Sequence, residues 1–199
     1  MLSLLRRRFR RAPESRSSQR TRLLETMPEH AVCAEIGVWK GDFAADILRV
    51  THPEKLYLID PWVFVDDERY RQSFYGGARA GDQRDMDAIY ADVSARFAQE
   101  IASGTVEICR ETSAAAAARL PLASLDWAYI DGDHTYDAVA LDLALYGERV
   151  KPGGWITGDD YGPGGWYDGG VMRAVDAYAS EATTELAVFW GAQFLLKKV

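Results

Sequence analysis

The chain has 199 residues and a formal net charge of −7, and its hydrophobic and charged fractions, 48% and 27%, are ordinary for a soluble globular protein. These values exclude a fully disordered or fibrous chain, and no apolar run reaches the ~18 residues that a membrane-spanning helix needs. The two cysteines, Cys33 and Cys109, exclude a disulfide-rich scaffold and a zinc site of clustered thiolates. We expect a reduced, cytoplasmic protein without stable membrane insertion.

The charge is distributed unevenly along the chain. Residues 1–22 carry eight arginines against one acid, Glu14, whereas the remaining chain carries 15 basic and 29 acidic residues. The acidic body argues against nucleic acid as the main ligand, because phosphate neutralisation needs a basic face. Residues 1–22 are predicted to be a mobile basic segment, with contact to anionic lipid or RNA as the alternative. A short helix is expected at Arg22–Met27.

From residue 31 onward, strand-like and helix-like segments alternate. Strands are predicted at Ala31–Val38, Lys55–Pro61, Thr105–Arg110, Leu125–Ile130 and Trp155–Gly158, and helices at Asp42–Val50, Met86–Ala102, Ser113–Leu120, Tyr136–Val150 and Val171–Ala182. Near-continuous apolar strands that alternate with helices are typical of a parallel sheet covered on both faces. We therefore predict a doubly wound α/β domain over residues 23–199.

The end of the chain departs from this alternation. Glu185–Trp190 and Gln193–Lys198 are joined by only two residues, which requires an antiparallel hairpin. A second departure is the long connection 62–104, which is predicted to be a lid-like insertion because its aromatic and glycine residues suit a cover over a substrate. A surface elaboration without ligand contact is the alternative.

The turn after the first predicted strand, Glu35-Ile-Gly-Val-Trp-Lys-Gly41, lies where ligands bind in open α/β sheets. A dinucleotide fingerprint would need glycines at 37, 39 and 42, but the chain has Trp39 and Asp42. The turn therefore suits a nucleotide-like ligand without a polyphosphate, and the carboxylate of Glu35 suits a cationic group such as an α-amino group.

Asp60 ends the second predicted strand, nineteen positions beyond Gly41. An acid at this place commonly accepts both hydroxyls of a ribose. A ribose without phosphates, together with an amino acid end, describes S-adenosylmethionine. A structural turn with a solvated aspartate is the alternative.

Three further acids follow the fourth and fifth predicted strands. If these strands are neighbours, Asp131, Asp159 and Asp160 lie close together, and like charges at such distances destabilise a fold unless a cation offsets them. Hard oxygen ligands without a nearby thiolate favour Mg²⁺ or a similar divalent ion. The alternative is that some of these acids cap helices or turns, as Asp133 could for the helix at Tyr136.

His134 stands three residues beyond Asp131, at the entry to a predicted helix. A histidine beside a divalent ion can take a proton from a substrate hydroxyl that the ion has acidified. A solvent-facing residue at the start of a helix is the alternative interpretation.

These segments together resemble the class I S-adenosylmethionine-dependent methyltransferases, and more closely the magnesium-dependent O-methyltransferases of the macrocin type, which act on sugar hydroxyls. The resemblance is carried by Ala34–Gly41 (AEIGVWKG), Leu58–Trp62 (LIDPW), Leu125–Tyr136 (LDWAYIDGDHTY), Lys151–Tyr161 (KPGGWITGDDY) and, more weakly, Gly169–Tyr178. It implies a seven-stranded, mostly parallel sheet in the order 3-2-1-4-5-7-6, with the last strand antiparallel.

The resemblance also implies roles for individual residues. Glu35, Gly37, Trp39, Gly41 and Asp131 would lie along the cofactor, Asp60 would hold its ribose and Ser113 would lie near its adenine. The implied metal ligands are Asp131, Asp159 and Asp160, and His134 matches the general base.

The sequence thus predicts metal-assisted methyl transfer to a hydroxyl of a small molecule or sugar. A metal-independent methyltransferase, a nonenzymatic S-adenosylmethionine-binding or interaction module, and an NAD-dependent oxidoreductase are the alternatives. The acceptor is not determined, although the aromatic residues Tyr70, Phe74, Tyr75, Trp166 and Tyr167 suit a sugar face or a planar phenol. A homo-oligomer is left open.

Overall fold

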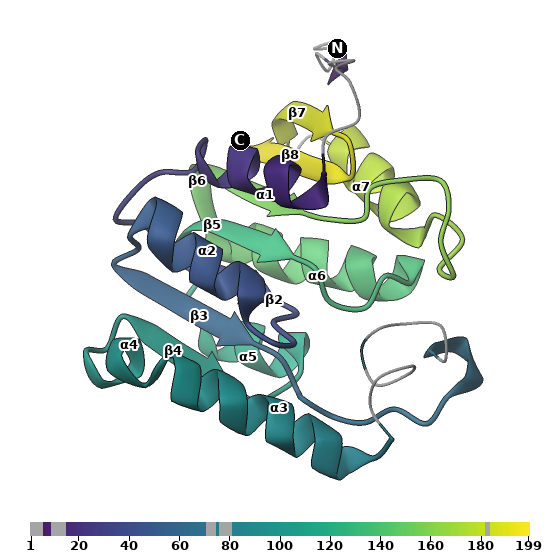
Figure 1. The fold of residues 1–199 in the computed structure, drawn as a ribbon. Helices are drawn as coiled ribbons and strands as arrows, with labels where there is room; N and C mark the ends of the chain where they lie inside the picture. The colour runs from purple at the N-terminus through teal and green to yellow at the C-terminus, as the bar shows by residue number, and fades with distance from the viewer. Residues whose placement is uncertain (1–5, 9–14, 71–74, 76–80, 182–183) are drawn as a thin grey trace.

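The computed structural model describes residues 6–8, 15–70, 75, 81–181 and 184–199, and these form an α/β fold around one sheet (Figure 1). The sheet has eight strands in the order β1-β7-β8-β6-β5-β2-β3-β4. Their bounds are β1 (Arg6–Arg8), β2 (Val32–Ile36), β3 (Lys55–Ile59), β4 (Val106–Cys109), β5 (Leu125–Ile130), β6 (Val150–Gly158), β7 (Thr184–Trp190) and β8 (Gln193–Lys198).

The number of strands differs from the expected seven because Arg6–Arg8 pairs in parallel with β7 at the edge of the sheet. The other seven strands follow the expected order. β8 runs antiparallel to both of its neighbours, β6 and β7. For β7 this follows from the two-residue connection. The fold is therefore Rossmann-like and mostly parallel, as predicted, with one strand more than expected.

Helices cover both faces of the sheet (Figure 1). They are α1 (Arg16–Leu24), α2 (Asp42–Thr51), α3 (Gln83–Arg96), α4 (Ala98–Ala102), α5 (Ser113–Arg119), α6 (Tyr136–Arg149) and α7 (Gly170–Ser180), with a 3₁₀ turn, η1, at Glu68–Tyr70. Two differ from expectation: the helix expected at Met86–Ala102 is divided at Phe97, and the first helix starts at Arg16 instead of Arg22. None of the described helices could serve as a membrane span.

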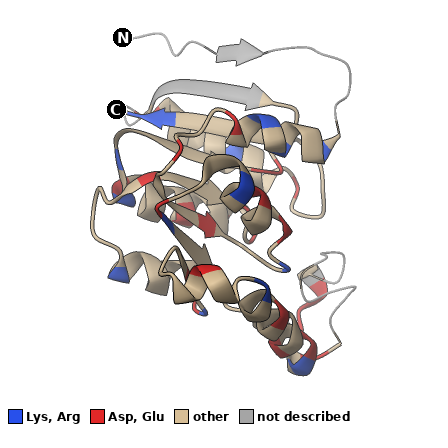
Figure 2. Ribbon diagram, turned by 60° about the vertical axis from the view of Figure 1, so that its left-hand side comes forward, with Lys and Arg blue, Asp and Glu red and all other residues tan. Residues whose placement is uncertain are grey.

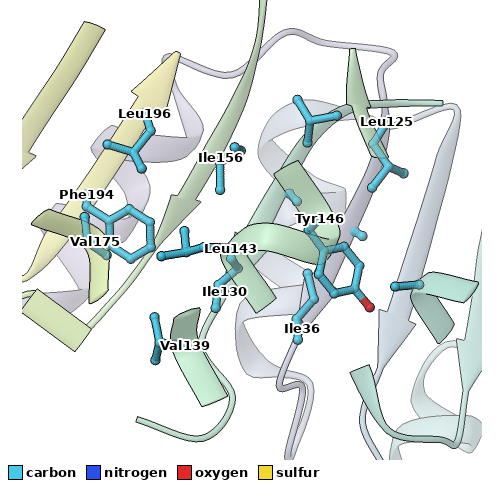
Figure 3. Packing of buried hydrophobic residues seen from close by; sticks show 14 of the residues in the cluster. Ile36, Leu125, Ile130, Val139, Leu143, Tyr146, Ile156, Val175, Phe194 and Leu196 are labelled. Atoms are coloured by element: carbon cyan, nitrogen blue, oxygen red, sulfur yellow. The ribbon is translucent and has the colours of Figure 1, made fainter. Parts of the chain in front are cut away.

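One core lies between the sheet and helices α5, α6 and α7. Figure 3 shows Val139 and Leu143 of α6 and Val175 of α7 among the sheet residues Ile130 and Phe194. All five side chains are at most 3% exposed. This packing fixes the N-terminal end of α6, and with it the loop 131–135, against the sheet.

A second core lies on the opposite face, under α1, α2 and α3. Leu23 and Leu24 of α1 are 0% and 1% exposed, and they pack with Ile47 of α2 and Met86 of α3. Full burial of a leucine side chain stabilises a fold by roughly 1.5–3 kcal/mol. Helix α1 is therefore held on the sheet by apolar packing. The second half of the insertion 62–104 belongs to this core as well, since Met86 and Val93 are buried in it.

The start of α1 depends on its N-cap. The Ser15 hydroxyl accepts a hydrogen bond from the Ser18 N–H at 3.2 Å, which satisfies one of the free donors of the first turn. The mobility expected for residues 1–22 stays a prediction, and residues 1–5 and 9–14 of this segment lie outside the described residues.

Candidate functional site

The ends of β2, β3 and β5 meet at one edge of the sheet. The Asp131 N–H donates to the Ile36 carbonyl at 2.8 Å, and the Gly37 N–H donates to the Ile59 carbonyl at 2.9 Å. Gly37 has φ +90°, and a Cβ at this position would lie 2.2 Å from the carbonyl oxygen of Asp131. Only glycine fits here, so the turn after β2 lies directly against the segment that carries Asp131.

Asp60 closes the turn between β2 and α2. One of its carboxylate oxygens accepts from the N–H groups of Val38 and Trp39, at 3.0 and 2.9 Å. The other accepts from the Trp62 N–H at 2.7 Å and from the Tyr75 hydroxyl at 2.6 Å. Burial raises the pKa of Asp60, while these hydrogen bonds oppose the increase. A ribose hydroxyl would have to replace one of these four donors. The Tyr75 hydroxyl is the candidate for replacement, because it belongs to a side chain whereas the other three donors are backbone N–H groups.

Glu35 is 2% exposed, and one of its carboxylate oxygens has no hydrogen-bond partner among the described residues. Burial and the neighbouring charge of Asp131 hold its pKa well above the ordinary value. A buried acceptor of this kind suits a ligand that brings its own donor. Trp39 and Gly41 have φ values of +50° and +72°, so both residues of this turn adopt the left-handed conformation.

The acidic residues after β5 and β6 are bound by arginines of α1, whose basic positions are blue in Figure 2. The Nε of Arg20 donates to Asp159 at 2.8 Å, and a terminal nitrogen of the same guanidinium donates to Asp131 at 2.6 Å. Arg16 forms an ion pair with Asp160. The arginines expected in a mobile segment therefore contact the acids that were expected to hold a metal ion.

Asp159 is not available as a free metal ligand. One of its oxygens accepts from the Gln193 side-chain amide at 2.5 Å and from the Asp160 N–H at 2.7 Å. Its other oxygen accepts from Arg20. The expected set of three free aspartates is therefore not what the structure brings together, because the donors of α1 and β8 already occupy both oxygens of one member.

The remaining potential ligands are Asp131, His134 and Asp160, each of which offers one atom within 4.8 Å of the others. This set contains an imidazole nitrogen, whereas Mg²⁺ prefers oxygen ligands in near-ideal octahedral geometry. In addition, the guanidinium groups of Arg16 and Arg20 balance two of the three negative charges of Asp131, Asp159 and Asp160. The residues present therefore do not fit the magnesium site expected from the sequence.

His134 faces the remaining negative charge. Its Nε2 lies 3.4 Å from an Asp131 oxygen and 3.5 Å from an Asp160 oxygen, and the side chain is 20% exposed. Burial lowers the pKa of His134, but the hydrogen bond and charge of Asp131 and the charges of Asp160 and Asp133 outweigh it, so the pKa is raised. When the imidazole is protonated, its positive charge balances the negative charge of the carboxylates. When it is neutral, it can act as a base.

Two aromatic rings lie beside His134 among the described residues. The ring of Tyr167 is 5.1 Å from it and that of Trp166 is 6.2 Å away, and Trp166 in turn contacts Tyr70 at 5.3 Å between ring centroids. The Tyr70 hydroxyl donates to Asp133 at 2.6 Å. Asp133 also accepts from the Thr135 N–H, so it caps the turn before α6. The insertion thus reaches the site through Tyr70 and Tyr75, whereas Phe74 lies outside the described residues.

Ser113 begins α5, beyond the end of β4, and it contacts α6. Its carbonyl accepts from the Tyr146 hydroxyl at 2.9 Å. Its side chain hydrogen-bonds with Asp142, which is 4% exposed. Burial raises the pKa of Asp142 to about 6, although the bond to Ser113 opposes this. The sequence analysis did not single out Asp142.

This pKa predicts a pH-dependent effect of Asp142→Asn on stability. Because the pKa of Asp142 is raised in the folded state, the carboxyl group does not lower the free energy of unfolding below about pH 4, where it is protonated in both states. Between about pH 4 and 6 the destabilisation increases, and above about pH 6 it is constant. A shift from 3.8 to about 6 corresponds to about 3 kcal/mol. We expect the variant to raise the free energy of unfolding by up to about 3 kcal/mol at pH 7.5 and to leave it nearly unchanged at pH 4.

Urea denaturation at both pH values measures this effect. Asp137→Asn, on the exposed face of the same helix, is the matched control, for which we expect a change below about 0.5 kcal/mol. An Asp142→Asn variant that is less stable than the wild type at pH 7.5 would show that the charged carboxylate is needed by the fold.

The sequence analysis missed Arg16 and Arg20 as site residues. A signal for them was available, because Arg16, Arg20, Leu23, Leu24 and Met27 recur at the spacing of one helical face after a serine that can cap a helix. Gln193, which binds Asp159 from β8, had no comparable signal.

Comparisons with known proteins agree with this fold. The family model described as "Methyltransferase domain" matches residues 34–161, which run from β2 through the acidic residues after β6. No curated protein sequence matches the chain.

Solved structures with the same fold are distant in sequence. A protein from Streptococcus mutans, described as a candidate methyltransferase in complex with SAH, has a TM-score of 0.64 and 9% identity, covering 94% of this chain and 100% of its own. A candidate rRNA methylase from Clostridium thermocellum has a TM-score of 0.63 and 10% identity, with the same coverage. The O-methyltransferase NovP has a TM-score of 0.62 and 18% identity, covering 92% and 79%.

At these identities the solved structures show the shared fold alone. The family match is independent of them and covers well over half of the chain, including the turn after β2, the Asp131–His134 loop and the two acids after β6. The chain belongs to the methyltransferase-domain family.

Proposed function

We propose that the protein is an S-adenosylmethionine-dependent O-methyltransferase that acts on a hydroxyl of a small molecule or sugar, with His134 as the general base. The observation that carries this proposal is the position of His134, which lies among aromatic rings and faces Asp131 and Asp160 beside the glycine turn of β2. A base beside aromatic rings and next to a cofactor turn suits methyl transfer to a ring hydroxyl, because the rings can position the acceptor and the base can take its proton.

The cofactor would supply an electrophilic methyl group. Gly37, Trp39 and Gly41 would lie along its methionine part, where the backbone has the positive φ values that allow close approach. Glu35 has a buried oxygen ready to accept from an ammonium group. The neighbour from Streptococcus mutans is in complex with SAH, which supports this class of cofactor.

The other two cofactor contacts follow from the strand ends. Asp60 would accept from the ribose in place of the Tyr75 hydroxyl, so cofactor binding would release Tyr75 from its present bond. Ser113, at the N-terminus of α5, would lie near the adenine.

The protein side chains would orient the acceptor and remove its proton. Tyr70, Trp166 and Tyr167 present ring faces and edges that suit a sugar or a phenol. As the acceptor oxygen forms its bond to the methyl carbon, its proton would pass to Nε2 of His134, and Asp131 and Asp160 would stabilise the resulting imidazolium. Orientation of the two reactants accounts for much of such a rate enhancement, on the order of 7–11 kcal/mol in favourable cases.

A magnesium-assisted form of the same reaction, expected from the sequence, is the competing proposal. It is favoured only by the proximity of Asp131, His134 and Asp160, and it makes His134 a candidate ligand instead of a base. The presence of rRNA methylases among the structural neighbours makes a nucleic-acid acceptor a further outcome to test.

Two measurements test the proposal. Calorimetric titration should show binding of S-adenosylmethionine and its demethylated product, and no binding of NAD. Transfer of a labelled methyl group should then be measured to a panel of phenols, sugar-containing small molecules and rRNA. Cofactor binding with transfer to none of these acceptors would favour a nonenzymatic binding module, and transfer to rRNA alone would contradict the small-molecule acceptor.

A further inference from the structure

We propose that Arg20 is a built-in cation of the acidic cluster, which takes the place of a divalent ion and makes the reaction metal-independent. This inference rests on the proposed methyl transfer, but its central test is a metal-binding measurement that does not require activity. The acidic cluster is Asp131, Asp159 and Asp160, which follow two neighbouring strands.

The first argument is the position of the guanidinium. One terminal nitrogen of Arg20 lies 2.6 Å from an oxygen of Asp131 and 2.6 Å from an oxygen of Asp159. A metal ion that bridged these two carboxylates would have to coordinate the oxygens that now accept from Arg20. Since both oxygens are occupied by hydrogen bonds to one cation, binding of a bridging ion and the present position of Arg20 exclude each other.

The second argument is that Arg20 is held in place. Its helix is anchored by the buried Leu23 and Leu24, and the Ala192 N–H donates to the Gln19 side chain at 3.1 Å. The guanidinium also lies 5.2 Å from the ring centre of Phe43, in α2. The side chain of Arg20 is 26% exposed, whereas that of Arg16 is 60% exposed. Arg20 is therefore the fixed cation of the pair.

The third argument concerns charge. Arg16 and Arg20 balance two of the three carboxylate charges, and His134 lies within 3.5 Å of the oxygens that the arginines leave free on Asp131 and Asp160. A divalent ion added to this arrangement would give it an excess of positive charge. Arg20 acts here as a positioning residue, because it orients Asp131, whose other oxygen faces His134.

The test uses the full chain, freed of metal by dialysis against a chelator, and Mn²⁺ as the probe. We expect the wild type to leave the electron paramagnetic resonance signal of free Mn²⁺ unchanged and to keep its methyl transfer activity in EDTA. Arg20→Met removes the cation and should create a Mn²⁺ site at least about tenfold tighter than any in the wild type, because two carboxylates lose their counter-charge. Arg22→Met, on the same helix but facing Trp190, is the control and should resemble the wild type.

Thermal unfolding with Mn²⁺ or EDTA gives a second readout, which also covers an Arg20→Met chain that folds poorly. We expect Mn²⁺ to raise the melting temperature of Arg20→Met and to leave that of the wild type and Arg22→Met unchanged. Tight Mn²⁺ binding by the wild type, or loss of its activity in EDTA with recovery on adding the ion, would overturn the inference. So would an Arg20→Met chain that neither binds Mn²⁺ nor is stabilised by it. Absence of any methyl transfer, with these metal-binding results as expected, would count against the proposed function alone.

Discussion

Replacing Arg20 with methionine is expected to lower the free energy of unfolding by about 3–5 kcal/mol, because it leaves a buried carboxylate without its partner. The reason is the fate of Asp159. Its carboxylate is 0% exposed and its charge is balanced by Arg20 at 2.6 Å. Without the guanidinium, the folded state must keep an uncompensated buried charge or take up a proton, and either costs free energy.

A double variant separates this electrostatic effect from a loss of packing. Asp159→Asn removes the buried charge and keeps an amide oxygen that can accept from Gln193 and from the Asp160 N–H. We therefore expect Arg20→Met/Asp159→Asn to regain at least half of the stability that Arg20→Met loses. Urea denaturation at pH 7 measures both variants. Arg22→Met should cost less than about 1 kcal/mol, the size of a cation–π contact such as the one that half-buried Arg22 makes with the ring of Trp190. If the double variant is no more stable than Arg20→Met, the guanidinium acts through its packing on Phe43 instead of its charge.

Replacing His134 with alanine is expected to lower kcat by about 10²–10⁴-fold, the usual contribution of a general base, with a small effect on the binding of S-adenosylmethionine. Nε2 of the imidazole lies 3.4 Å from an Asp131 oxygen and 3.5 Å from an Asp160 oxygen, beside the ring of Tyr167. Steady-state kinetics with an acceptor from the panel, together with calorimetric titration of the cofactor, separates the two effects. His52→Ala, in the connection after α2, is the control and should leave kcat unchanged.

The pH dependence of the wild type distinguishes a base from a residue that only shapes the site. Because the pKa of His134 is raised, the neutral imidazole forms only above the ordinary titration range of histidine. We expect kcat to increase with pH through this raised pKa in the wild type, and we expect the increase to disappear in His134→Ala. An unchanged kcat in His134→Ala at every pH would remove His134 from the mechanism.

The arrangement of the site explains why α1 matters for both predictions. Residues after β5 and β6 supply the carboxylates and the proposed base, whereas the counter-charges come from a helix more than a hundred residues earlier in the chain. In the proposed mechanism Asp131 links Arg20 to the general base, because one oxygen of Asp131 accepts from Arg20 and the other faces His134.

The sequence by itself determined the alternation of strands and helices, the antiparallel hairpin and the edge of the sheet at which the candidate site residues gather. These follow from local patterns: apolar runs such as Leu125–Ile130, the two-residue connection before Gln193, and the rule that residues following parallel strands share one edge. For the same reason the proximity of Asp131, His134 and Asp160 could be predicted.

Only the tertiary structure decided what neutralises the carboxylates. A charge pattern along a chain does not show which distant cation approaches an acid, because that depends on where Leu23 and Leu24 are buried and hence on how α1 is oriented. A run of arginines followed by two leucines is compatible both with a solvated segment and with a docked helix. The long-range packing of α1 selects the second, and it places two guanidinium groups where the sequence suggested an ion.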